Sequence, residues 1–167
     1  MKIDFDQRAV IFIIPNHKLE GAQNFFRRIF SEIQVNKKFL IIEEDLNIFQ
    51  NLLQISSLVK AKNLTLFTTV NSNKLGLLFK ILHPSSRLVM RLGNTISLEI
   101  SKYSLKYFYH RLFYLASIFF CQKFIFQSNV MKKDFINFFK FKDSLKFIVI
   151  HNGVNSPDPS QKLEFLL

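Results

Sequence analysis

Short apolar runs alternate along this chain with segments whose apolar residues recur at helical spacing. The continuous apolar runs predict strands at Val10–Ile14, Lys38–Ile42, Leu64–Val70, Arg87–Leu92, Phe124–Phe126 and Phe147–Ile150. The helical spacing predicts helices at Ala22–Ile33, Leu46–Lys60, Leu75–Leu82, Leu98–Cys121 and Val130–Phe141. Strands without a polar face are typical of parallel sheets covered on both sides. The alternation predicts an α/β fold: a Rossmann-like, mostly parallel sheet with helices on both faces.

The placement of glycine adds a hint about a site. The chain has only four glycines. Gly21, Gly93 and Gly153 each follow a predicted strand, whereas Gly76 falls inside a predicted helix. Ligands of open α/β sheets bind beyond the carboxyl ends of the strands, so three glycines lie where a site is expected. Ordinary turn chemistry explains any one of them equally well.

Length and charge limit the partners. The 167 residues suffice for one domain with a real core, and 21 phenylalanines exclude a disordered chain. The net charge of +11 suits nucleic acid, anionic lipid or phosphorylated ligands, and it also serves solubility alone. A nucleic-acid-binding domain would rest on charge only, because the chain has no recognised nucleic-acid-binding motif.

Cysteine usage and hydropathy indicate a cytoplasmic protein. A single cysteine, Cys121, allows neither an intrachain disulfide nor a cysteine-based metal site. The most apolar stretch, Leu112 to Gln122, has about half of the roughly 20 residues that a spanning helix needs. We expect it to be a buried helix or one that touches a membrane surface.

Four segments stand out in order along the chain: EGAQNFFRRIF (Glu20–Phe30), RLVMRLGN (Arg87–Asn94), FIFQSNVMKKDF (Phe124–Phe135) and IVIHNGVN (Ile148–Asn155). Together they resemble the N-terminal half of a retaining, family 4 glycosyltransferase of the GT-B fold. The resemblance covers most of the chain and implies a Rossmann-like acceptor-side domain over residues 1–155. Where the family has two adjacent glycines at the first turn, this chain has Glu20-Gly21.

The matching positions give the candidate substrate-binding residues. Gly21 and Ala22 would offer backbone N–H groups to a diphosphate at a helix N-terminus, with a Gly-capped solvated loop as the alternative. Arg91 would either bind an anion or form an internal salt bridge, because a charge inside an apolar strand needs a partner. Asn94 is first a turn residue and second a sugar contact.

Three further candidates follow later strands. Ser128 is expected to cap a helix and is compatible with ligand contact. Asn152 and Gly153 form the turn that closes the domain, although an Asn-Gly pair also suits a hairpin. No residue is assigned a catalytic role.

Basic and aromatic residues also share one predicted helix. Lys102, Lys106 and His110 recur every four residues, beside Tyr103, Tyr107 and Tyr114. This pattern suits an anionic membrane surface, although a solvated face whose lysine stems cover core aromatics is the more common explanation. We therefore expect a cytoplasmic location, with peripheral binding at the inner face of the membrane.

The resemblance implies that the nucleotide-sugar is held by a second domain. A hinge and a strand stub at residues 156–167 would lead into it. We expect the N-terminal half of a truncated enzyme that transfers sugar from a nucleotide-sugar, its co-substrate, to a glycan or lipid-linked acceptor. Alone it would be inactive, and it needs no other cofactor or metal. The alternative is a non-catalytic acceptor-binding or membrane-docking subunit with a separate donor-binding chain as partner.

Overall fold

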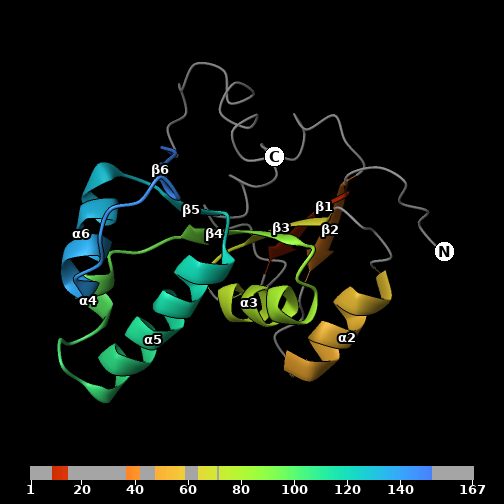
Figure 1. Ribbon diagram of the computed structural model, residues 1–167, viewed down its shortest axis with the longest axis horizontal. Coiled ribbons are helices and arrows are strands. Elements are labelled where there is room, and N and C mark those ends of the chain that lie inside the picture. Colours follow the sequence, from red (N-terminus) through yellow and green to blue (C-terminus); the bar gives the residue numbers. More distant parts are fainter. Residues whose placement is uncertain (1–8, 15–36, 42–47, 59–63, 71, 152–167) are drawn as a thin grey trace.

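The computed structural model describes residues 9–14, 37–41, 48–58, 64–70 and 72–151 (Figure 1). The strands are β1 (Ala9–Ile14), β2 (Lys37–Ile41), β3 (Leu64–Thr68), β4 (Arg87–Leu92), β5 (Lys123–Phe126) and β6 (Phe147–Val149). The helices are α2 (Ile48–Leu58), α3 (Asn73–Leu82), α4 (Ile96–Glu99), α5 (Leu105–Phe120) and α6 (Asn129–Phe139). These bounds confirm the six predicted strands to within two residues.

The six strands form one sheet in the order β2-β1-β3-β4-β5-β6. All five neighbouring pairs are parallel, so every carboxyl end lies at the same edge. The chain runs outward from β1 to β2 and then returns to β3 on the other side, which makes the β1/β3 boundary the switch point of the sheet. The predicted Rossmann-like α/β fold is confirmed.

The two faces of the sheet carry different residues because side chains alternate along a strand. On one face, Leu88, Met90 and Leu92 of β4 join Phe124 and Phe126 of β5 in the main core. All helices that the structure describes contribute to this core (Figure 1). The opposite face presents a second buried row: Val10, Phe12, Phe67, Val89, Arg91 and Ile125. The helix predicted at Ala22–Ile33 lies outside the described residues.

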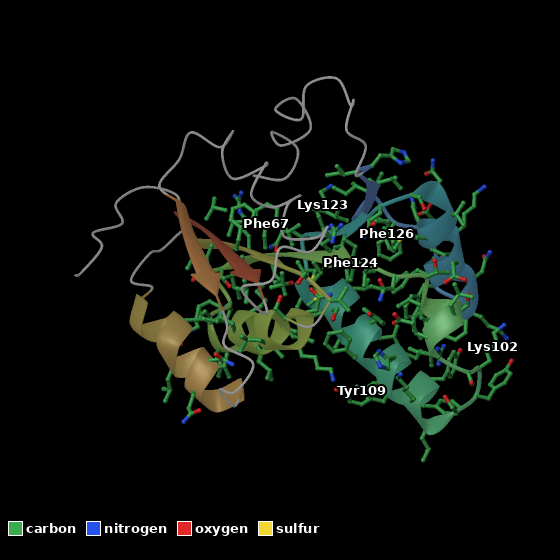
Figure 2. All side chains as sticks on the ribbon, turned by 180° about the vertical axis from the view of Figure 1, so that it is seen from behind. Phe67, Lys102, Tyr109, Lys123, Phe124 and Phe126 are labelled. Carbon is green, nitrogen blue, oxygen red and sulfur yellow. The ribbon has the colours of Figure 1, made fainter. Side chains whose placement is uncertain are left out.

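Phenylalanine dominates the core between β5, β6 and α6. Phe135 of α6 is fully buried, and Phe124 and Phe126 point toward it from β5 (Figure 2). Its ring centroid lies 5.0–6.2 Å from those of six others: Tyr114, Phe124, Phe126, Phe139, Phe141 and Phe147. Aromatic pairs at such distances add about 0.5–1.5 kcal/mol each beyond their buried area. The cluster fixes α6, and the end of α5 beside it, on the sheet.

Helix α3 lies unusually close to the sheet. A Cβ on Gly76 would come within 2.5 Å of Cγ2 of Thr68 and 3.0 Å of a methyl group of Leu88. At the other end of α3, the buried Lys80 ammonium donates to the carbonyls of Pro84 and Ser86. Gly76 thus permits the close packing, and Lys80 closes the turn that leads into β4.

One predicted element is wrong. The single helix expected at Leu98–Cys121 is two helices, α4 and α5, separated by residues 100–104. Tyr103 adopts a left-handed conformation (φ 63°), and the hydroxyl of Ser104 accepts a hydrogen bond from Tyr107 N at 3.1 Å. A left-handed residue followed by a serine N-cap ends one helix and starts the next, although no glycine or proline marks the break.

Candidate functional site

A pocket of about 300 Å³ opens at the carboxyl edge of the sheet, between β4 and the helices α3, α4 and α5. Its lining residues are Val70, Lys74, Leu92, Gly93, Asn94, Ile96, Glu99, Lys106, His110, Phe113 and Tyr114. We call this cavity the β4-edge pocket. It lies at the edge where open α/β sheets bind ligands, one strand away from the β1/β3 switch point.

Three nitrogen-bearing side chains line the pocket from two helices. Lys74 comes from the first turn of α3, and Lys106 and His110 come from one side of α5, four residues apart. The Lys74 ammonium lies 5.1 Å from the centroid of the Tyr109 ring, a cation–π distance. The Lys106 ammonium lies 3.5 Å from the carbonyl oxygen of Glu99. The pocket therefore offers two cations to an anionic group.

His110 is held toward its neutral form. Burial lowers the pKa of His110 below its usual 6.5, and the nearby Lys74 and Lys106 lower it further, against the opposing charge of Glu99. Its Nδ1 is buried and has no hydrogen-bond partner among the described residues. A neutral imidazole can accept a hydrogen bond from a ligand hydroxyl, which two lysines alone could not do.

Asn94 and Glu99 complete the polar lining. The Asn94 amide donates to a carboxylate oxygen of Glu99, which orients both side chains at the rim. The rest of the lining is largely apolar or aromatic and includes Val70, Ile96 and Phe113. An apolar wall with a few placed polar groups is typical of small-molecule sites.

Buried polar side chains keep the strand ends behind the pocket in register. Thr68 Oγ1 donates to Oδ1 of Asn73 at 2.6 Å, and Asn73 Nδ2 donates to the carbonyl of Arg91 at 3.3 Å. The Ser72 hydroxyl accepts from Thr69 N at 2.9 Å and donates to the carbonyl of Ile13 at 3.0 Å. These bonds join β1, β3, β4 and the start of α3, so Lys74 is presented from a rigid turn.

Arg91 lies away from the pocket. It is 1% exposed, on the sheet face opposite the described helices, and burial lowers its pKa to about 10. Its Nη1 lies 4.0 Å from where a Cβ of Gly93 would be, so the guanidinium reaches the loop after β4. The structure thus confirms a buried arginine near a strand end but does not bring it together with Asn94 in one site.

The two other described candidates have structural roles. The Ser128 hydroxyl accepts from Met131 N at 3.2 Å, which confirms it as the N-cap of α6. Gly93 lines the pocket beneath the neighbouring loops: Gln127 Nε2 donates to its carbonyl at 2.9 Å, and a Cβ there would approach Val70 to 2.8 Å. Neither observation requires a ligand.

Four predicted positions, Gly21, Ala22, Asn152 and Gly153, lie outside the described residues. The predicted basic stripe is partly wrong. Lys106 and His110 do share a side of α5, but Lys102 precedes the helix and lies near its N-terminal end (Figure 2). Of the aromatic neighbours, Tyr107 and Tyr114 are buried and Tyr103 is exposed.

Sequence reasoning missed Lys74 and Glu99. Lys74 lies in the first turn of α3, six residues after the end of β3. The available signal for this helix start was Ser72, because serine often precedes a helix. Glu99 is the only acidic residue between positions 72 and 133, which marks it as unusual in a basic segment.

The described residues contain no group of histidine, cysteine and acidic side chains suited to a metal ion. Cys121 is buried, and burial raises the pKa of its thiol to about 12, so the thiolate is strongly disfavoured.

Among the described residues, no helix has the length and apolar character needed to cross a bilayer. Compared with known proteins, the chain matches no family model, no curated protein and no solved structure.

Proposed function

We propose that this chain is the acceptor-binding half of a sugar transferase of the GT-B type, and that the β4-edge pocket receives the acceptor. The supporting observation is the pocket's position and lining. It lies at the carboxyl edge of a Rossmann-like parallel sheet, and Lys74, Lys106 and His110 line it together with apolar residues. The resemblance of four segments to this family agrees with that position.

The lining favours an acceptor with an anionic group. Two ammonium groups and one carboxylate, that of Glu99, leave an excess of positive charge while His110 is neutral. Asn94, Glu99 and His110 supply donors and acceptors for hydroxyl groups, as a sugar requires. A sugar phosphate, free or carried by a lipid, combines both features.

The nucleotide-sugar donor would be bound by a partner domain or chain. Stabilisation of the leaving diphosphate is usually a large part of the catalytic effect, and the resemblance assigns that role to a second, donor-binding domain. We therefore expect this chain to bind the acceptor without transferring sugar. A non-catalytic acceptor-binding subunit would use the same pocket.

The first test measures binding of N-acetylglucosamine 1-phosphate and of N-acetylglucosamine by calorimetry. We expect the phosphorylated sugar to bind at least about tenfold more tightly, because only it engages both lysines. Lys106→Gln should abolish most of this preference, whereas Lys133→Gln, an exposed lysine of α6, should not. Equal binding of the two sugars, or equal effects of the two variants, would contradict the proposed pocket.

The second test concerns the partner. A chain that carries the donor-binding half should co-purify with this chain and restore transfer from a radiolabelled nucleotide-sugar. Transfer by this chain alone would contradict the proposed division of roles. If the chain binds the acceptor but no reconstituted complex transfers sugar, the transferase proposal is wrong and the alternative, a non-catalytic acceptor-binding subunit, is supported.

A further inference from the structure

Helix α5 exposes an apolar stripe that the sheet and its core do not use. Five large residues recur at intervals of three and four: Leu105, Phe108, Leu112, Leu115 and Phe119. They are 44–90% exposed, and we call them the outer stripe. At 3.6 residues per turn they lie along one side of the helix, away from the buried Tyr107, Tyr114 and Ser117.

The outer stripe places large apolar residues on the side of α5 that is turned away from the core. On that side a surface helix normally turns charged and polar residues to water. The neighbouring α3 also exposes Leu78, Ile81 and Leu82. Contiguous exposed apolar residues of this kind mark an interaction surface.

The part of the chain that carries this surface is strongly basic. Residues 72–151 contain thirteen of the 23 basic residues of the chain but only three of its twelve acidic residues, Glu99, Asp134 and Asp143. A second copy of this chain would bring the same positive field to the interface and be repelled. An anionic surface would be attracted.

Basic side chains stand at both ends and along one side of the outer stripe. Lys102 lies just before its N-terminal end (Figure 2). Arg111 is exposed along the side, with Nε 3.3 Å from the carbonyl of Phe139. At the C-terminal end, Lys146 donates to the carbonyl of Ile118 at 2.6 Å and lies 3.4 Å from that of Phe119. Apolar residues bordered by cations match the acyl boundary and the headgroups of an anionic bilayer.

We propose that the outer stripe docks this protein onto an anionic bilayer, with α5 lying in the plane of the interface. The 16 residues of α5 span about 24 Å, shorter than the roughly 30 Å hydrocarbon core, so the helix lies on the membrane rather than across it. The opposite side of the same helix lines the β4-edge pocket through Lys106 and His110. This docking does not depend on the proposed sugar transfer.

The test is co-sedimentation of the full chain with vesicles of phosphatidylcholine alone and vesicles that also contain phosphatidylglycerol. We expect binding to the anionic vesicles that weakens as salt is added. The double variant Leu112→Glu/Phe119→Glu should reduce partitioning by at least about tenfold. The control Val130→Glu/Leu145→Glu makes the same charge change at two exposed apolar residues outside the stripe. It should bind the anionic vesicles with only a small loss of partitioning relative to the unmodified chain.

A second readout reports insertion directly. The chain has no tryptophan, so Phe108→Trp gives a single reporter in the stripe and Leu145→Trp a control. Only the Phe108→Trp emission should shift to the blue when anionic vesicles are added. Circular dichroism establishes that each variant is folded, which we expect because all these side chains are exposed.

Two results would overturn the proposal. One is the absence of a difference between the anionic and the neutral vesicles. The other is a dimer or a protein complex in the absence of lipid that Leu112→Glu/Phe119→Glu dissociates, because the stripe would then be a protein interface. Loss of sugar-phosphate binding with vesicle binding intact would count against the proposed function alone.

Discussion

Helices α5 and α6 cover the same face of the sheet yet differ on the side they turn to solvent (Figure 1). Both begin at a serine whose hydroxyl accepts a hydrogen bond from the backbone N–H three residues later: Ser104 for α5 and Ser128 for α6. Both place aromatic rings in the core. Outward, however, α6 presents Asn129, Lys133 and Asn137, whereas α5 presents the outer stripe.

We infer from this difference that folding does not require the apolar exterior of α5. Helix α6 packs inward in the same way with a mostly polar exterior, in which Val130 is the exposed apolar residue, so we expect the fold to tolerate polar residues on α5. Exposed leucine and phenylalanine carry a cost in solubility that the sequence of α6 avoids. A separate function of the exterior of α5 is the simplest reason for it.

The largest expected effect is on the free energy of unfolding, and it distinguishes a core residue of α6 from an outer-stripe residue of α5. Phe135→Ala in α6 removes the ring that contacts six others and should lower the free energy of unfolding by about 3–5 kcal/mol. Leu112→Ala in α5 should change it by less than about 0.5 kcal/mol, because that side chain is exposed. Urea unfolding measured by circular dichroism gives both values. A large loss for Leu112→Ala would mean that the outer stripe is packed within the monomer.

A smaller effect on the free energy of unfolding is expected from the feature that α5 and α6 share, the serine N-cap. Ser104→Ala and Ser128→Ala each remove a cap and should each cost about 1 kcal/mol of unfolding free energy. The matched variants Ser104→Asp and Ser128→Asp keep an accepting oxygen and should retain most of the stability. If alanine costs nothing at Ser104, the start of α5 is set by the left-handed Tyr103 rather than by the cap.

The sequence allowed the strands of this fold to be predicted because each is a continuous apolar run. The usual markers of a break between α4 and α5 are absent, because residues 100–104 contain neither glycine nor proline. Ser104 was the one usable signal, since a serine before an apolar run is a common helix start. The left-handed conformation of Tyr103 had no signal in the sequence, because tyrosine rarely adopts it.

The candidate site was predictable only where its residues share one helix. The four-residue spacing of Lys106 and His110 placed them on one side of α5, and the structure confirms it. Lys74 and Glu99 reach the same pocket from α3 and α4, a proximity that no local pattern contains. The outer stripe was hidden for another reason. In a helix that is apolar on both sides, periodicity cannot tell which side the core covers.

The smallest effect concerns the pocket side of α5 and depends on pH. Burial and the charges of Lys74 and Lys106 lower the pKa of His110 in the folded chain, against the effect of Glu99. In the unfolded chain the pKa is about 6.5, so the unfolded state binds the proton first as pH falls. Stability should therefore decrease below about pH 6.5 and level off once the pH passes the folded pKa.

His110→Gln should remove this part of the pH dependence, and the difference between the two urea-unfolding profiles isolates it from the carboxylates. NMR titration of the His110 ring gives the folded pKa directly. A bound sugar phosphate would offset the charges of Lys74 and Lys106, so its addition should raise that pKa. A pKa of His110 that stays unchanged when N-acetylglucosamine 1-phosphate binds would place the anion elsewhere. Because the outer stripe faces away from His110, Leu112→Glu should leave the same titration unchanged, and the two sides of α5 would then be shown to act independently.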